Sequence, residues 1–110
     1  MLTKKPKNLT QIYSQLEPEI ILKSIIKFAR ISKYEIDHFD EENNIIILSK
    51  AIGFFDYGFF FPIYISIENS RTLIEIGIKS KVLQLGPIPE RTLERFVTGI
   101  KTSLYLKERE

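Results

Sequence analysis

Two neighbouring stretches of the chain place an apolar residue at nearly every second position, and this pattern constrains the fold more than any other feature. In the first stretch one face is wholly apolar and carries Phe59, Phe61, Ile63, Ile65 and Ile67. In the second stretch the corresponding face carries Thr72, Ile74, Ile76 and Ile78. If Ile67 lies opposite Thr72, both apolar faces coincide, whereas a slip of one residue would turn one of them over. The sequence therefore predicts an antiparallel hairpin with strands near 59–68 and 72–80.

The opposite face of this hairpin carries a second set of large side chains. It holds Phe60, Pro62, Tyr64 and Leu73, and we expect Phe39 from an earlier strand to join them. Because a two-layer fold leaves one face of its sheet open, these five residues predict an interface. The cover is expected to be a second copy of the chain, another protein or the segment 8–16. Pro62 lacks a backbone donor, so it should face a strand edge or a bulge.

Apolar stripes with helical spacing lie on either side of the strands. A helix is expected near 18–31, where Pro18 suits the first position and the stripe is Ile21, Leu22, Ile25, Ile26, Phe28 and Ala29. A second helix is expected near 89–106, with the stripe Leu93, Phe96, Val97, Ile100 and Leu104. Two further strands near 33–39 and 45–52 flank a polar turn. The order predicts an α+β fold, a two-layer sandwich in which a four-stranded antiparallel meander carries both helices on one face.

The expected core follows from the faces on which these stripes coincide. It comprises Ile21, Ile25, Phe28, Phe61, Ile63, Ile65, Ile74, Ile76, Phe96, Val97 and Ile100. Gly99 interrupts the second helical stripe at a cost of about 1 kcal/mol against alanine, and we expect it to permit close packing. Residues 17–110 are expected to form a single domain and residues 1–16 an N-terminal extension. Within this extension a short helix or turn is favoured by the helical spacing of Leu9, Ile12, Tyr13 and Leu16.

Residue types that carry catalysis or bind metal ions are scarce. The chain has no cysteine and a single histidine, His38, which excludes disulfides, thiolate metal sites and cysteine catalysis. The carboxylates of residues 40–42 occupy one polar turn without the spacing of a calcium loop. The glycines are scattered, so they form no phosphate-binding loop. The sequence therefore predicts no catalytic residue, no metal site and no cofactor, and an enzyme is the class of function that it supports least.

Two groups of residues are candidates for binding a ligand. The first would wall a pocket between the sheet and the C-terminal helix, and it comprises Phe54, Phe55, Asp56, Phe59 and Phe96. In this group Asp56 is either a turn residue whose carboxylate accepts backbone hydrogens or a buried acid with a raised pKa. The second is a basic patch around the start of the last helix, formed by Lys79, Lys81, Arg91 and Arg95. Helix N-termini favour anions, but Pro87 and Pro89 remove two donors there, so a solvated patch is the default.

Several of these motifs resemble those of an uncharacterised domain family found in bacteria and in chloroplast-bearing organisms. The aromatic–Asp turn of that family is similar to "GFFDYGFFFPIYI", and its polar strand end is similar to "IKSK". Gly86 and Arg91 match a glycine and an arginine that open the family's final helix. The family's aspartate before that glycine is absent here, and Ile88 or Pro89 replaces its asparagine. The resemblance spans residues 17–105, implies the same order of elements and implies no known activity.

Three functions are consistent with these features. The first is a non-catalytic module that assembles with itself or with another protein. The second is a domain that binds a small apolar ligand, such as a lipid or cofactor, in the pocket described above. The third is single-strand RNA binding on sheet aromatics, against which the net negative charge of residues 34–75 argues, so we expect no nucleic-acid partner. No stretch is apolar over the length of a membrane span, and we expect a cytoplasmic protein, or alternatively one of the plastid stroma.

Overall fold

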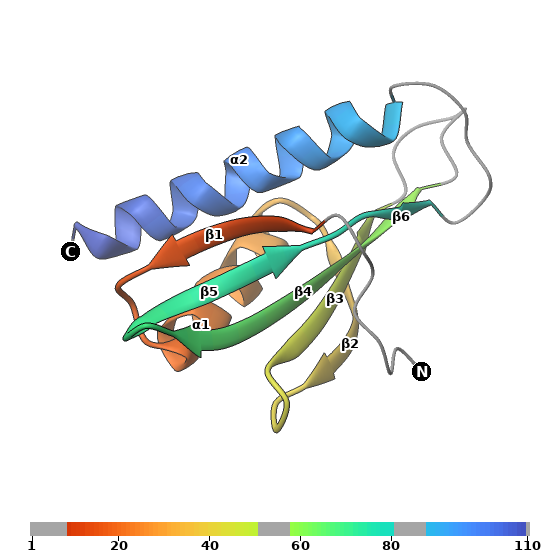
Figure 1. Cartoon of the computed structure of the whole chain (residues 1–110). Helices are drawn as coiled ribbons and strands as arrows, with labels where there is room; N and C mark the ends of the chain where they lie inside the picture. Colours follow the sequence, from red (N-terminus) through yellow and green to blue (C-terminus); the bar gives the residue numbers. More distant parts are fainter. Residues whose placement is uncertain (1–8, 51–57, 81–87, 110) are drawn as a thin grey trace.

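The computed structural model describes residues 9–50, 58–80 and 88–109, and Figure 1 shows how their helices and strands are arranged. In chain order the elements are β1 (Thr10–Ser14), α1 (Pro18–Ile31), β2 (Glu35–Asp40), β3 (Ile45–Lys50), β4 (Phe59–Glu68), β5 (Arg71–Ile76), β6 (Lys79–Ser80) and α2 (Ile88–Glu108). The strands form one antiparallel sheet in the order β1-β5-β4-β3-β2, and the short β6 pairs with β4. The α+β class and the antiparallel sheet are confirmed, but five strands follow this path rather than the predicted four.

The β4–β5 hairpin has the register that its alternating pattern predicts. Ile67 lies opposite Thr72, and the inward apolar residues of both strands face each other as far as Ile63 and Ile76. The turn between the strands consists of Asn69 and Ser70, whose φ angles of 53° and 63° are left-handed. A two-residue turn of this hand matches the twist of a hairpin. The turn and the period of two therefore select the same pairing.

The predicted strand 72–80 is divided in the structure, because β5 ends at Ile76 and β6 begins at Lys79. Pro62 of the central strand β4 lies at this interruption, where its carbonyl oxygen accepts a hydrogen bond of 2.9 Å from the N–H of Gly77. Pro62 is thus not on a strand edge. Its missing donor instead coincides with the break in the ladder, which is a position that a sheet tolerates for proline.

The N-terminal segment contains a strand, so the predicted helix or turn is wrong. β1 pairs with β5, with Thr10 opposite Ile76 and Ser14 opposite Thr72. Ile12 points into the core and is 9% exposed. The segment that the sequence separates as an extension therefore contributes an edge strand to the sheet.

Both helices lie over the same face of the sheet, because their apolar residues share one core with the inward residues of the strands. Every predicted core residue belongs to this cluster except Phe28, which is half-buried and packs against it. At the centre the rings of Phe61 and Phe96 stack with their centroids 4.0 Å apart. The first helix has the predicted bounds, and the second begins one residue earlier and ends two residues later than predicted.

Gly99 lies at a close contact between the two helices. A Cβ atom at this position would lie 2.7 Å from Cε1 and 2.9 Å from Cζ of Phe28. The Phe28 ring therefore occupies the space that any side chain of residue 99 would need. The same ring meets Phe96 edge-on, with centroids 5.8 Å apart. The close packing expected at Gly99 is thus confirmed as a contact between the α2 backbone and an aromatic ring of α1.

The outer face of the sheet is covered more fully than the sequence predicts. Tyr64 is 4% exposed and Leu73 is 5% exposed within the single chain, Pro62 is buried and Phe60 is half-buried. A second chain is therefore not required to remove Tyr64 or Leu73 from water. For these two side chains the expected cover by a second copy or by another protein is therefore corrected, whereas Phe60 is half-buried.

Phe39 lies on the inner face of the sheet rather than on the outer one. The register of β2 against β3 shifts between Ile36 and His38, so Asp37 is the extra residue of a bulge. Beyond the bulge Phe39 pairs with Ile46, which belongs to the core. The predicted side of Phe39 is wrong because one inserted residue reverses the alternation of a strand. Its side chain is 40% exposed.

Candidate functional site

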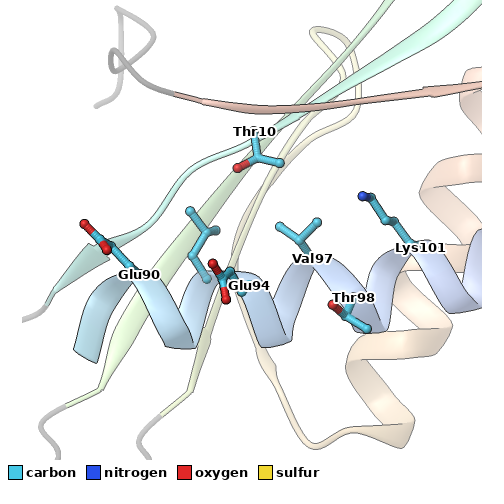
Figure 2. A pocket seen from close by; sticks show the side chains of 7 residues that line it. Thr10, Glu90, Glu94, Val97, Thr98 and Lys101 are labelled. Carbon is cyan, nitrogen blue, oxygen red and sulfur yellow. The ribbon is translucent and has the colours of Figure 1, made fainter. Parts of the chain in front are cut away.

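A groove of about 510 Å³ lies between the start of β1 and one side of α2. Its lining residues are Thr10, Glu90, Leu93, Glu94, Val97, Thr98 and Lys101. Figure 2 shows Thr10 on the strand side of this space and the other labelled side chains along the helix. The groove is therefore bounded by an edge strand on one side and by a helix on the other.

The burial of α2 determines which of its side chains reach this groove. One stripe of the helix is held in the core by Phe96, Ile100 and Leu104. The groove residues of the neighbouring stripe are Glu90, Glu94, Val97 and Lys101. They follow one another at intervals of four, three and four residues, which places them along one side of a helix. The core contacts of α2 therefore direct this second stripe toward β1.

A hydrogen bond ties the end of β1 to the last turn of α2. Ser14 Oγ donates to Glu108 Oε2 at 3.1 Å and accepts a hydrogen bond of 3.1 Å from the N–H of Leu16. Ser14 is 4% exposed, so its hydroxyl satisfies these partners away from water. Strand and helix are close at Ser14, and the groove opens at Thr10, the other end of the strand.

The groove combines an apolar floor with charges of opposite sign. Leu93 packs against the core and Val97 is 6% exposed, and these two side chains form the floor. Glu90 and Glu94 are exposed and lie one turn apart, while Lys101 follows Glu94 by about 10 Å along the helix axis. Within the described ranges, none of these three charged side chains forms an ion pair. The groove thus has an acidic end and a basic end, both free to contact a ligand.

Phe59 and Phe96, which were predicted to wall a ligand pocket, do not line this groove. Phe59 and Phe96 are 0% and 1% exposed. Their ring centroids lie 6.5 Å and 4.0 Å from that of Phe61. The other three predicted residues, at 54–56, lie outside the described residues. The space around Phe61 is filled by aromatic rings, and the groove opens on the side of α2 that faces β1.

A half-buried phenol lies at the rim of the aromatic core. The Tyr34 ring packs edge-on against Phe96 at 5.1 Å between centroids, and Lys50 Nζ lies 4.6 Å from the Tyr34 centroid. Burial raises the pKa of Tyr34, and the positive charge of Arg95 opposes this rise. The phenol therefore stays protonated at neutral pH. It contributes packing and no general base.

The predicted basic patch is only partly visible. Lys79, Arg91 and Arg95 are exposed, and Lys81 lies outside the described residues. No hydrogen bond or ion pair joins the three side chains that are described. In the same part of the chain, no group of three or more His, Asp or Glu side chains is placed to hold a metal ion. None of the helices described is long and apolar enough to cross a membrane.

The groove was not predicted from the sequence, although the spacing of charged residues along α2 is one indication of it. Glu90, Glu94 and Lys101 keep helical spacing beside the core stripe, and Val97 lies among them. Such a row is indistinguishable from an ordinary solvated helix face until a second wall is known. That wall contains Thr10, in a segment that was not predicted to be a strand.

The comparison with solved structures identifies the fold of this chain. Nineteen chains match it, and one of them is titled "Crystal structure of Ara h 8.0201". The TM-score is 0.62 at 9% sequence identity, and the match covers 88% of this chain and 93% of that chain. The two share their fold, which in this chain is an antiparallel sheet against a long C-terminal helix. At this identity the likeness concerns the fold alone.

No protein-family model matches the chain, and no curated protein matches it either. The resemblance to the domain family of bacteria and chloroplast-bearing organisms therefore stays a prediction.

Proposed function

We propose that this protein is a non-catalytic domain that binds a small ligand with an apolar body in the groove between β1 and α2. The observation that carries the proposal is the groove itself, whose 510 Å³ lies within the range of small-molecule sites. Leu93 and Val97 offer apolar surface at its floor, while charged and hydroxyl groups at its rim orient a ligand. The fold supports the proposal, because its long helix is fixed at one end and spaced from the sheet edge at the other.

The proposal is tested by filling the groove without disturbing the core. Thr98 is exposed and lines the groove, whereas Thr102 is an exposed threonine of the same helix that does not. The neutral fluorophore N-phenyl-1-naphthylamine serves as an apolar probe. We expect Thr98→Trp to weaken probe binding by about tenfold and Thr102→Trp to leave it unchanged. Equal probe affinity in the two variants and the unmodified protein would refute the site, and native mass spectrometry of the purified protein checks for a ligand retained from the cell.

Self-association is a second candidate, favoured by a different observation. Ile36 and Phe39 on β2 are 41% and 40% exposed, and Ile31 at the end of α1 is 71% exposed. Contact between these side chains of two copies would remove apolar surface from water. Light scattering over a range of concentrations should then show a dimer that Phe39→Glu dissociates. A monomer at every concentration would contradict this second candidate and leave the groove proposal intact.

A further inference from the structure

The order of charges along the groove selects for a ligand with two unlike ends. Glu90 and Glu94 are like charges on one helix face, an arrangement that costs stability in an isolated helix. Lys101 stands beyond the apolar floor on the same side of α2. A bound cationic group near the two carboxylates would relieve their repulsion, and an anionic group would match Lys101. The complementary ligand is therefore linear, positive at one end and negative at the other.

The distance between these charges limits the length of such a ligand. Along the helix axis Lys101 lies about 10 Å from Glu94 and about 16 Å from Glu90, at 1.5 Å per residue. An extended polypeptide spans about 3.3–3.6 Å per residue. The two charged ends of a free peptide would therefore reach both sites when it contains about three to five residues.

The second wall of the groove, which Thr10 forms, belongs to an edge strand. In the described part of the sheet β1 pairs with β5 alone, so alternate residues of β1 direct N–H and C=O groups away from the sheet. The sequence of β1, TQIYS, carries no charge that would oppose an added strand. Thr10 belongs both to this strand and to the groove lining.

From the charges, the spacing and the free strand edge, we infer that the ligand of the groove is a short extended peptide with free termini. Its N-terminal amine lies at Glu90 and Glu94, its C-terminal carboxylate lies at Lys101, and its apolar side chains cover Leu93 and Val97. Backbone hydrogen bonds to Thr10, the residue of β1 that lines the groove, hold it extended at this point. The inference names the ligand class of the proposed site and therefore rests on the proposed function.

The test uses the tetrapeptide Ala-Ile-Val-Ala in four forms, with free ends, with the amine acetylated, with the carboxylate amidated, and with both ends blocked. Calorimetry on the full chain measures each affinity. We expect acetylation to weaken binding about three- to fivefold in the unmodified protein, as for an exposed ion pair, and to have no effect in the Glu90→Gln/Glu94→Gln variant. Amidation should weaken binding similarly, and this effect should vanish in Lys101→Met and persist in Lys27→Met, an exposed lysine of α1.

Each result bears on the inference separately from the proposed function. Equal affinity for the free and doubly blocked peptides overturns the inference in the unmodified protein, whatever the variants do. An effect of acetylation that persists in the glutamine variant overturns the assigned orientation. If the neutral fluorophore binds and Thr98→Trp blocks it while the peptide does not bind, the peptide inference fails and the groove proposal stands. If neither probe binds, both fail.

Discussion

The two edges of the sheet, β1 and β2, protect their backbone by different means. An edge strand presents unpaired N–H and C=O groups that invite pairing by another chain. β2 carries Glu35, Asp37 and Asp40 within six residues, and its bulge interrupts the register. β1 carries no charged side chain, alternates between exposed and buried positions, and lies beside α2. The β2 edge thus relies on charge and irregularity, whereas the β1 edge relies on its helix neighbour.

The two edges therefore differ in how an added chain could reach them and in how much they are expected to contribute to stability. At β1 an added chain would have to fit between strand and helix, so access is selective by shape. At β2 the charges and the bulge oppose regular pairing, while Ile36 and Phe39 remain 41% and 40% exposed to water. We therefore expect substitutions to affect folding strongly at β1 and weakly at β2.

The largest contrast is expected between matched isoleucines on the two edges. Ile12 of β1 is 9% exposed and Ile36 of β2 is 41% exposed. Ile12→Ala should lower the free energy of unfolding by about 2–4 kcal/mol, because it removes buried methylene groups and leaves a cavity. Ile36→Ala should lower it by less than about 1 kcal/mol, because much of that side chain is already hydrated. Urea denaturation of both variants measures the two losses of unfolding free energy. Equal losses would show that the two edges contribute equally to stability.

A smaller effect is expected at the hydroxyl that joins β1 to α2. Ser14→Ala should cost about 1–2 kcal/mol of unfolding free energy, because it leaves the N–H of Leu16 without its hydroxyl partner and removes the bond to Glu108. Glu108→Gln is the control, since an amide oxygen still accepts a hydrogen bond from Ser14. Thermal unfolding should show a smaller loss for Glu108→Gln than for Ser14→Ala. The reverse order would mean that the strand is held by something other than this bond.

The smallest expected effect is a pH dependence of the unfolding free energy that arises from Asp40, at the end of β2. The side-chain amide of Asn43, followed by its backbone N–H, hydrogen-bonds the Asp40 carboxylate and lowers the pKa of Asp40. Because the folded pKa lies below the unfolded one, this stabilisation is present above about pH 4 and is lost as the pH falls through the folded value. The difference in stability between the unmodified chain and Asp40→Asn should therefore narrow from pH 7 to pH 3. A difference that stays constant with pH would show that the carboxylate charge contributes nothing.

The helices and the strands β2 to β5 were predictable from the sequence, whereas β1 and its pairing with β5 were not. The β4–β5 hairpin was predictable because two apolar faces and a two-residue turn allow one register. β1 was not, because Ile12 and Tyr13 fit helical spacing as well as alternation, and the buried polar Ser14 hides the strand pattern. The partner of β1 is also remote, with Gln11 and Glu75 separated by 64 positions.

One inserted residue and one missed strand account for the errors in the candidate sites. The pattern of apolar and polar residues does not reveal the bulge at Asp37. The face of Phe39 was therefore predicted from a regular alternation, which the bulge interrupts. The groove needs both β1 and α2, so a missed β1 removed one of its walls. The burial of Phe59 and Phe96 was predictable as apolar patterning, but whether buried rings pack together or enclose a space depends on packing that the sequence does not encode locally.

The steric contact between Gly99 and Phe28 limits how far the C-terminal helix can move against α1. Because a Cβ atom at residue 99 would lie 2.7 Å from Cε1 of Phe28, the ring leaves little room for α2 to rotate about its axis or to slide along α1. The direction in which Glu94 and Lys101 project is therefore fixed from the far side of the helix, by a residue that lines no groove. A smaller side chain at position 28 would give α2 more freedom to move. The positions of the charged groups proposed to bind the two ends of a ligand would then change, although every residue that lines the groove is retained.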